Sequence, residues 1–125
     1  MTHKEFVPYA EALALKELHF DEPCFGIHYN EGLNPSFMMA AQYGEHGAAA
    51  NGGILAPLYQ QAFKFFRDKY RLDGKPEYFL NDWYCFIIND MEGKDTSRRL
   101  FTDFPSYEEA ELQCLKKLIE IAKEK

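Results

Sequence analysis

Apolar and polar positions alternate most clearly in the last part of the chain, where apolar residues recur at helical spacing. Ser106 stands at the expected N-cap position, and Glu109 three residues later completes a capping box. Acidic residues occupy the first turns and lysines the later ones, as the helix dipole favours. The pattern therefore predicts an amphipathic helix from Tyr107 to Lys125. Its apolar face consists of Leu115, Leu118, Ile119 and Ala122.

An earlier helix is predicted over Pro8–Leu18. Proline suits the first helical turn, where its missing amide costs nothing. The expected apolar stripe consists of Ala10, Leu13, Ala14 and Leu18. His19 follows at a position where glycine would be the easier left-handed cap. Asp21-Glu22-Pro23 then ends the helix.

A middle helix is predicted over Pro57–Leu72, where aromatic residues recur at helical spacing. Gly74 and Pro76 are expected to end it. We expect Phe63 and Phe66 to face the same core as the apolar face of the last helix, because both stripes have helical period.

Four strands are predicted between the helices. The first pair spans Cys24–Tyr29 and Phe37–Tyr43, with a turn at Asn30-Glu31-Gly32. The second pair spans Tyr78–Ile88 and Arg99–Phe104, with a turn at 89–93. The resulting order is α-ββ-α-ββ-α. It favours an α+β fold in which an antiparallel four-stranded sheet has helices packed on one face.

Length and charge narrow the expected class of protein. The 125 residues suit a single domain over 1–125, and the 16% aromatic content can supply its core. The net charge of −6 argues against a broad phosphate-binding surface, so nucleic acid is not the expected partner. The N-terminus lacks a signal-peptide pattern and no apolar run is long enough for a membrane span, so we expect a cytoplasmic protein with no membrane partner.

Catalytic and metal-binding motifs are missing from the sequence. The three cysteines are odd in number and widely spaced, which argues against disulfides and zinc. Cys24 and His28 are four residues apart, so on a strand of period two their side chains share one face. Two residues of one strand rarely form a nucleophile–base pair, however. We therefore expect no catalytic residues, no metal and no cofactor, and a protein that is not an enzyme.

Four residues are candidates for ligand binding. His46, beside Glu45, lies in the glycine-rich segment 44–53, which lacks the Gly-Lys-Ser/Thr of a P-loop and is expected to be a mobile connector or a lid. Tyr59 belongs to the helix that would line a pocket with this loop. Trp83 and Tyr84 lie in an aromatic strand that could stack on bases or form a protein interface.

Three blocks of sequence resemble a family of small uncharacterised proteins from tailed bacteriophages and from prophage-like regions of gut bacteria. The blocks are 15–26 (LKELHFDEPCFG), 56–70 (APLYQQAFKFFRDKY) and 107–121 (YEEAELQCLKKLIEI). This chain departs from the family pattern at His19, where glycine is usual, and in its long Gly/Ala loop. The resemblance implies a phage or mobile-element setting and assigns no functional residue.

Together these observations favour a non-enzymatic protein that binds another macromolecule, most readily a protein, in the cytoplasm of a bacterial host. The sequence also leaves a homo-oligomer open. One alternative is a small-molecule binder, such as a nucleotide-signal sponge of the phage anti-defence type. A second alternative is a nucleic-acid accessory protein, which a basic groove would indicate.

Overall fold

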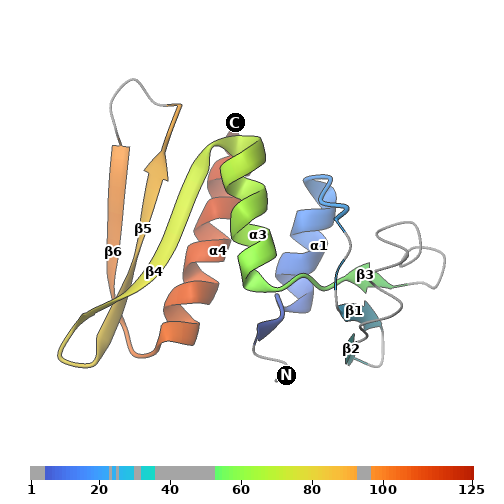
Figure 1. The fold of residues 1–125 in the computed structure, drawn as a ribbon, viewed down its shortest axis with the longest axis horizontal. Coiled ribbons are helices and arrows are strands. Elements are labelled where there is room, and N and C mark those ends of the chain that lie inside the picture. The colour runs from blue at the N-terminus through green and yellow to red at the C-terminus, as the bar shows by residue number, and fades with distance from the viewer. Residues whose placement is uncertain (1–4, 23, 25, 30–31, 36–52, 93–96) are drawn as a thin grey trace. The chain divides into compact units, whose positions relative to one another are not determined.

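A computed structural model describes residues 5–22, 24, 26–29, 32–35, 53–92 and 97–125 (Figure 1). The chain mixes helices and antiparallel sheets, which confirms the α+β class. It divides into two compact units, Met1–Ala62 and Phe63–Lys125, and each is described by itself. The single domain over 1–125 stays a prediction.

The first unit contains one helix, three short strands and the start of a second helix. These are α1 (Tyr9–Glu17), β1 (Gly26–Tyr29), β2 (Gly32–Pro35), β3 (Ile54–Leu55) and the beginning of α3 (Tyr59–Phe65). The strands form an antiparallel sheet in the order β2-β1-β3. The second strand of the expected hairpin is therefore Gly32–Pro35, while the stretch 37–43 lies outside the described residues.

The core of the first unit forms where β1 meets the chain before α1. A Cβ atom on Gly26 would come within 2.8 Å of the Phe6 ring, so only glycine allows this close approach. Val7 donates its N–H to the Pro57 carbonyl at 2.8 Å, which joins the two segments that lead into α1 and α3. Phe6 and Val7 are both fully buried.

The apolar stripe predicted for α1 is wrong for two of its four members. The buried residues on this side are Ala12, Leu15 and Leu18, whereas Ala10 and Leu13 are exposed. Alanine and leucine occur all around this helix, so two stripes of similar hydrophobicity were available. The spacing alone did not decide between them.

The end of α1 forms a Schellman motif. Phe20 donates its N–H to the Leu15 carbonyl and His19 donates its N–H to the Lys16 carbonyl, both at 3.0 Å. His19 adopts a left-handed conformation with φ 68°. The predicted left-handed cap is thus present, with a histidine where glycine would be less strained.

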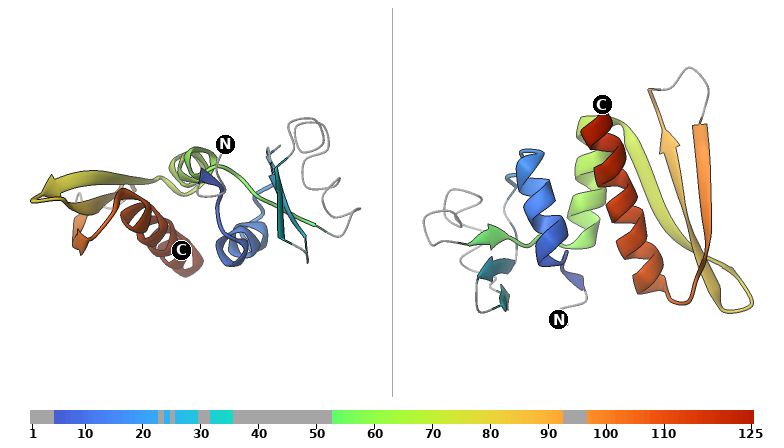
Figure 2. Two further views of the ribbon diagram at one scale, coloured as in Figure 1. Left: turned by 90° about the horizontal axis from the view of Figure 1, so that it is seen from below. Right: turned by 180° about the vertical axis from the view of Figure 1, so that it is seen from behind.

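The second unit contains the rest of α3, a π-helical turn, three strands and the last helix. Their bounds are η2 (Phe66–Tyr70), β4 (Leu72–Leu80), β5 (Trp83–Asp90), β6 (Ser97–Phe104) and α4 (Tyr107–Glu124). The sheet is antiparallel with the order β4-β5-β6, and α4 lies against one of its faces (Figure 2). Arg71, with φ 58°, ends the helical segment.

The expected four-stranded sheet is not formed by the described strands, which make two three-stranded sheets instead. The segment 78–88 was predicted as one strand, but it turns back at Asn81-Asp82. These residues have φ values of 52° and 64°, which is the geometry of a type I′ hairpin turn. Gly74 and Pro76 were predicted to end a helix, and both lie inside β4.

Helix α4 agrees closely with its prediction. The Ser106 Oγ accepts a hydrogen bond from the Glu109 N–H at 3.1 Å. The Glu109 carboxylate is directed instead to Gln113, whose Nε2 donates to it at 3.0 Å. The predicted apolar residues Leu115, Leu118, Ile119 and Ala122 are all buried, as are Phe63 and Phe66 of the same unit.

Two β-bulges interrupt the sheet of the second unit. In β4, Phe79 is an extra residue between the pairs Tyr78–Tyr84 and Leu80–Trp83. In β6, two residues lie opposite Cys85, and one of them, Asp103, has φ 76°. Bulges of this kind increase local twist and redirect the side chains that follow.

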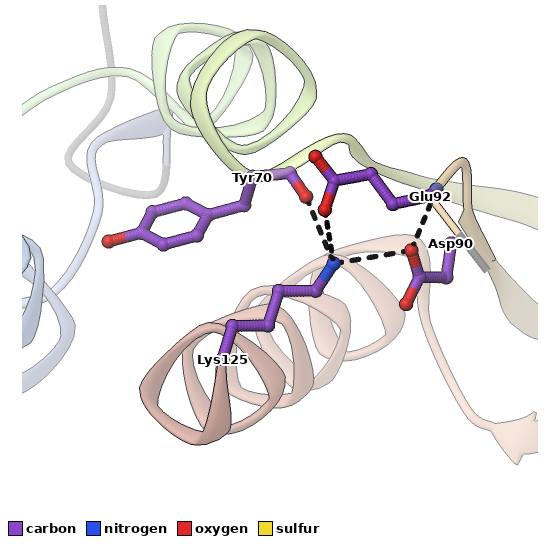
Figure 3. A network of polar contacts seen from close by, with 4 residues as sticks. All are labelled: Tyr70, Asp90, Glu92 and Lys125. Atoms are coloured by element: carbon purple, nitrogen blue, oxygen red, sulfur yellow. Dashed lines mark hydrogen bonds and ion pairs between the residues drawn. The ribbon is translucent and has the colours of Figure 1, made fainter.

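At the other end of the second unit, Lys125 joins three segments (Figure 3). Its Nζ donates to the Tyr70 carbonyl at 3.3 Å and to Asp90 Oδ1 at 3.2 Å, and it pairs with Glu92 at 3.5 Å. Glu92 also donates its N–H to Asp90 Oδ1 at 3.1 Å. Lys125 therefore offsets part of the negative charge that Asp90 and Glu92 place at this end of the sheet.

Candidate functional site

The β4–β5 hairpin ends in large apolar side chains that are exposed to solvent. Tyr78 is 58% exposed, Trp83 45% and Phe79 41%, although such residues are normally buried. Leu80 and Tyr107 are exposed as well. We call this group, together with Tyr84, the aromatic end. Its members are Tyr78, Phe79, Leu80, Trp83, Tyr84 and Tyr107.

Three tyrosines of the aromatic end contact one another in a row. Tyr84 meets Tyr78 edge to face at 5.6 Å between ring centroids, and meets Tyr107 edge to face at 6.2 Å. Tyr78 also accepts a hydrogen bond from the Asp82 N–H at 3.4 Å, across the hairpin turn. The row therefore links β4, β5 and the first turn of α4 in one preorganised surface.

Trp83 and Tyr84 are consecutive residues of β5, so they belong to opposite faces of the sheet. The contact between Tyr84 and Tyr107 places Tyr84 on the face that α4 covers. Trp83 belongs to the other face, with its pair partner Leu80. The two residues therefore do not form one flat stacking platform, and the aromatic end presents apolar side chains from both faces.

Two glutamates of α4 adjoin the tyrosine row. Partial burial and the nearby Glu108 carboxylate raise the pKa of Glu111 to about 7. Burial raises the pKa of Tyr107, and the charges of Glu111 and Glu108 add to this effect. Both effects disfavour additional negative charge around Tyr107 and Glu111.

The four candidate binding residues do not converge in the described structure. Trp83 and Tyr84 lie at the aromatic end, whereas Tyr59 is buried within the first unit. His46 lies outside the described residues, as does the segment 44–52 that was expected to be a connector or a lid. The ligand-binding roles of all four residues stay predictions.

The aromatic end also includes a residue that sequence reasoning did not select. Tyr107 was treated only as part of the last helix, although it contacts Tyr84. Glu111 was likewise assigned only to the helix dipole. A usable signal was available, because Glu108 and Glu111 have no lysine or arginine three or four residues further along the helix.

Cys24 and His28 are bound to separate backbone carbonyls. The Cys24 thiol donates to the Glu22 carbonyl at 3.2 Å, and His28 Nε2 lies 2.7 Å from the Val7 carbonyl, which it can reach as a donor. Burial raises the pKa of Cys24 to about 12, with a smaller contribution from Glu22. Cys24 is therefore held as a thiol, which is the unreactive form.

A small cavity of the second unit is lined by described residues. This cavity, lined by Leu72, Ile88, Asp90, Arg99 and Ile121, has about 20 Å³, which is room for roughly one water molecule. In the ranges that the structure describes, no three histidine, cysteine, aspartate or glutamate side chains form a group that could hold a metal.

Helices of the described segments lack the combination of length and apolar character that crossing a bilayer requires. Comparisons with protein-family models, curated proteins and solved structures give no match for this chain. The candidate site therefore stands on its own geometry.

Proposed function

We propose that this protein is not an enzyme and acts by binding another protein through the aromatic end. The observation that supports the proposal is the exposure of Tyr78, Phe79, Leu80 and Trp83 at the tip of one hairpin. Tyrosine and tryptophan are enriched among the residues that dominate binding energy at protein interfaces.

The structure of the hairpin adds a second argument. A surface that is already ordered loses less conformational entropy when it binds. The type I′ turn orders the hairpin backbone, and the Tyr78–Asp82 hydrogen bond and the tyrosine row hold the tyrosine rings before a partner arrives. The aromatic end thus combines a large apolar area with a small ordering cost.

The proposed setting is a phage or mobile element in a bacterial cytoplasm. Support for it comes only from the resemblance of the three sequence blocks to small phage proteins. The partner is then a bacterial host protein or another protein encoded by the same element.

Site-specific photo-crosslinking tests the proposed surface. A benzophenone amino acid is placed at Phe79 or Leu80 in the full chain, and at Met91 as the control. Met91 is also a large exposed apolar residue, and it lies at the opposite end of β5. We expect the first two positions to capture the same protein in bacterial cells, and Met91 to capture none of it.

Two outcomes of the crosslinking experiment would contradict the proposed surface. Equal capture of one protein from all three positions would show contact that is not confined to the aromatic end. Capture from Met91 alone would place the interface elsewhere. Either outcome would overturn the assignment of this surface.

A further inference from the structure

Glu108 and Glu111 of α4 have no lysine or arginine three or four positions away on the helix. The residue three positions after Glu108 is Glu111, and the one four positions after it is Leu112. After Glu111, the same positions hold Cys114 and Leu115. By contrast, Glu120 pairs with Lys117 at 3.1 Å.

Two lysines of the second unit have partners other than Glu108 and Glu111. Lys117 pairs with Glu120 and also lies over the Phe101 ring, at 5.8 Å from its centroid. Lys75 pairs with Asp73 at 3.6 Å. Among the described residues, neither the Glu108 nor the Glu111 carboxylate has a hydrogen-bond or ion-pair partner.

The helix dipole does not account for Glu111. Its stabilising effect falls off after the first turn, and Glu111 is the fifth residue of α4. The pKa of its carboxyl is raised rather than lowered, so its surroundings offer no compensating positive charge. A cation placed beside Glu111 would relieve this cost.

Besides the two carboxylates, the tyrosine row supplies aromatic rings that can bind a cation. Aromatic ring faces attract guanidinium groups, which also form paired hydrogen bonds with carboxylates. Exposed acidic residues continue around this end of the unit at Glu77, Asp82 and Asp103. The surface therefore complements a partner that carries both positive charge and apolar area.

We propose that the Tyr84–Tyr107 pair with Glu108 and Glu111 forms a docking site for an arginine of a basic segment in the partner protein. The inference rests on the proposed function and names the chemistry of its partner. The guanidinium lies against the tyrosine rings and bridges the two carboxylates, while apolar residues of the same segment contact Phe79, Leu80 or Trp83. Arginine fits better than lysine because its planar group can do both at once.

The test uses the full chain and two labelled peptides in fluorescence polarisation at pH 8. One peptide alternates arginine with leucine, and the other carries neutral citrulline in place of each arginine. We expect the citrulline peptide to bind about tenfold more weakly, as the loss of a charge-assisted hydrogen bond implies.

Variants of the chain locate the binding. Glu111→Gln and Glu108→Gln should each weaken the arginine peptide about tenfold, whereas Glu124→Gln should change it less than twofold. Glu124 supplies the matched control, since it makes the same charge change in the last turn of α4. Tyr107→Phe should preserve binding and Tyr107→Ser should weaken it, because the ring face makes the contact. Circular dichroism confirms folding of each variant.

Three outcomes would overturn the inference: no binding of the arginine peptide, equal binding of the citrulline peptide, or equal losses in Glu111→Gln and Glu124→Gln. If crosslinking from Phe79 still captures one protein in that case, the aromatic end binds a partner of different chemistry. If that crosslink also fails, the proposed function fails with it.

Discussion

Gly74 of β4 and Cys114 of α4 lie so close together that a single added carbon would not fit between them. A Cβ atom at position 74 would come within 2.9 Å of the Cys114 Sγ and within 2.8 Å of the Leu118 Cδ1. Cys114 and Leu118 are both fully buried. The contact between the last helix and the sheet therefore depends on a glycine in the strand.

Gly74→Ala should lower the free energy of unfolding by about 1–3 kcal/mol, the usual range for overpacking a core. Chemical denaturation of the variant measures the change. Cys114→Ala in the Gly74→Ala background should recover part of the loss, because it removes one of the two clashing atoms. Strictly additive effects of the two substitutions would contradict the contact.

The left-handed cap of α1 can be improved. His19→Gly should raise the free energy of unfolding by about 0.5–1 kcal/mol, since glycine adopts positive φ without the Cβ penalty. Thermal denaturation measures the shift, and His19→Ala serves as the control. Alanine shares the Cβ penalty, so it should not stabilise the chain. Equal effects of the two substitutions would show that strain at φ 68° is not the cause.

Two of the three thiols should be inert in the folded protein. Burial raises the pKa of both Cys24 and Cys114 to about 12, and nearby acidic groups add to it. Iodoacetamide at pH 8 should therefore leave both unmodified until denaturant is added. Peptide mass spectrometry identifies the alkylated positions. Rapid alkylation of either residue in the native protein would contradict its burial.

Stability should depend on pH through Glu111. Its pKa in the folded chain, about 7, lies above the ordinary value of 4.5, so the folded state holds the proton more tightly than the unfolded state does. This stabilisation is complete below pH 4.5 and is lost as the pH rises through 7. Glu111→Gln should remove the dependence and stabilise the chain at pH 8 by about 1 kcal/mol or less, given solvent screening.

Denaturation curves at pH 5, 6, 7 and 8 test whether the stabilisation from protonated Glu111 is lost as the pH rises. The difference between Glu111→Gln and the parent chain should grow in favour of the variant as the pH rises. Glu124→Gln again provides the control for a change in net charge. A difference that shrinks with rising pH would mean that the Glu111 carboxylate is stabilised by a positive group.

The last helix was predictable because several local signals agree. Ser106, the charge distribution and the apolar face all specify the same segment, and the observed helix spans Tyr107–Glu124. The hairpin at Asn81-Asp82 was missed because continuous hydrophobicity on both sides masked a two-residue turn. An Asn-Asp pair can adopt positive φ at both positions, so the signal was present but weak.

The candidate site was harder to predict, since it depends on tertiary contacts. Trp83 and Tyr84 were found from their aromatic character alone. Their separation onto opposite faces follows from the two-residue period of a strand, but which of the two faces α4 covers depends on tertiary packing. Tyr107 comes next to Tyr84 only after α4 packs on the sheet. No periodicity in the sequence predicts the contact between Tyr84 and Tyr107.

The sheet of the second unit has two edge strands, and each carries an interruption. Pro76 in β4 has no N–H to offer to an incoming strand, and the bulge at Asp103 distorts the backbone of β6. Unprotected edges invite neighbouring chains to extend the ladder and assemble into fibrils. These two positions should keep concentrated solutions free of such polymers, although the same unit exposes several aromatic rings.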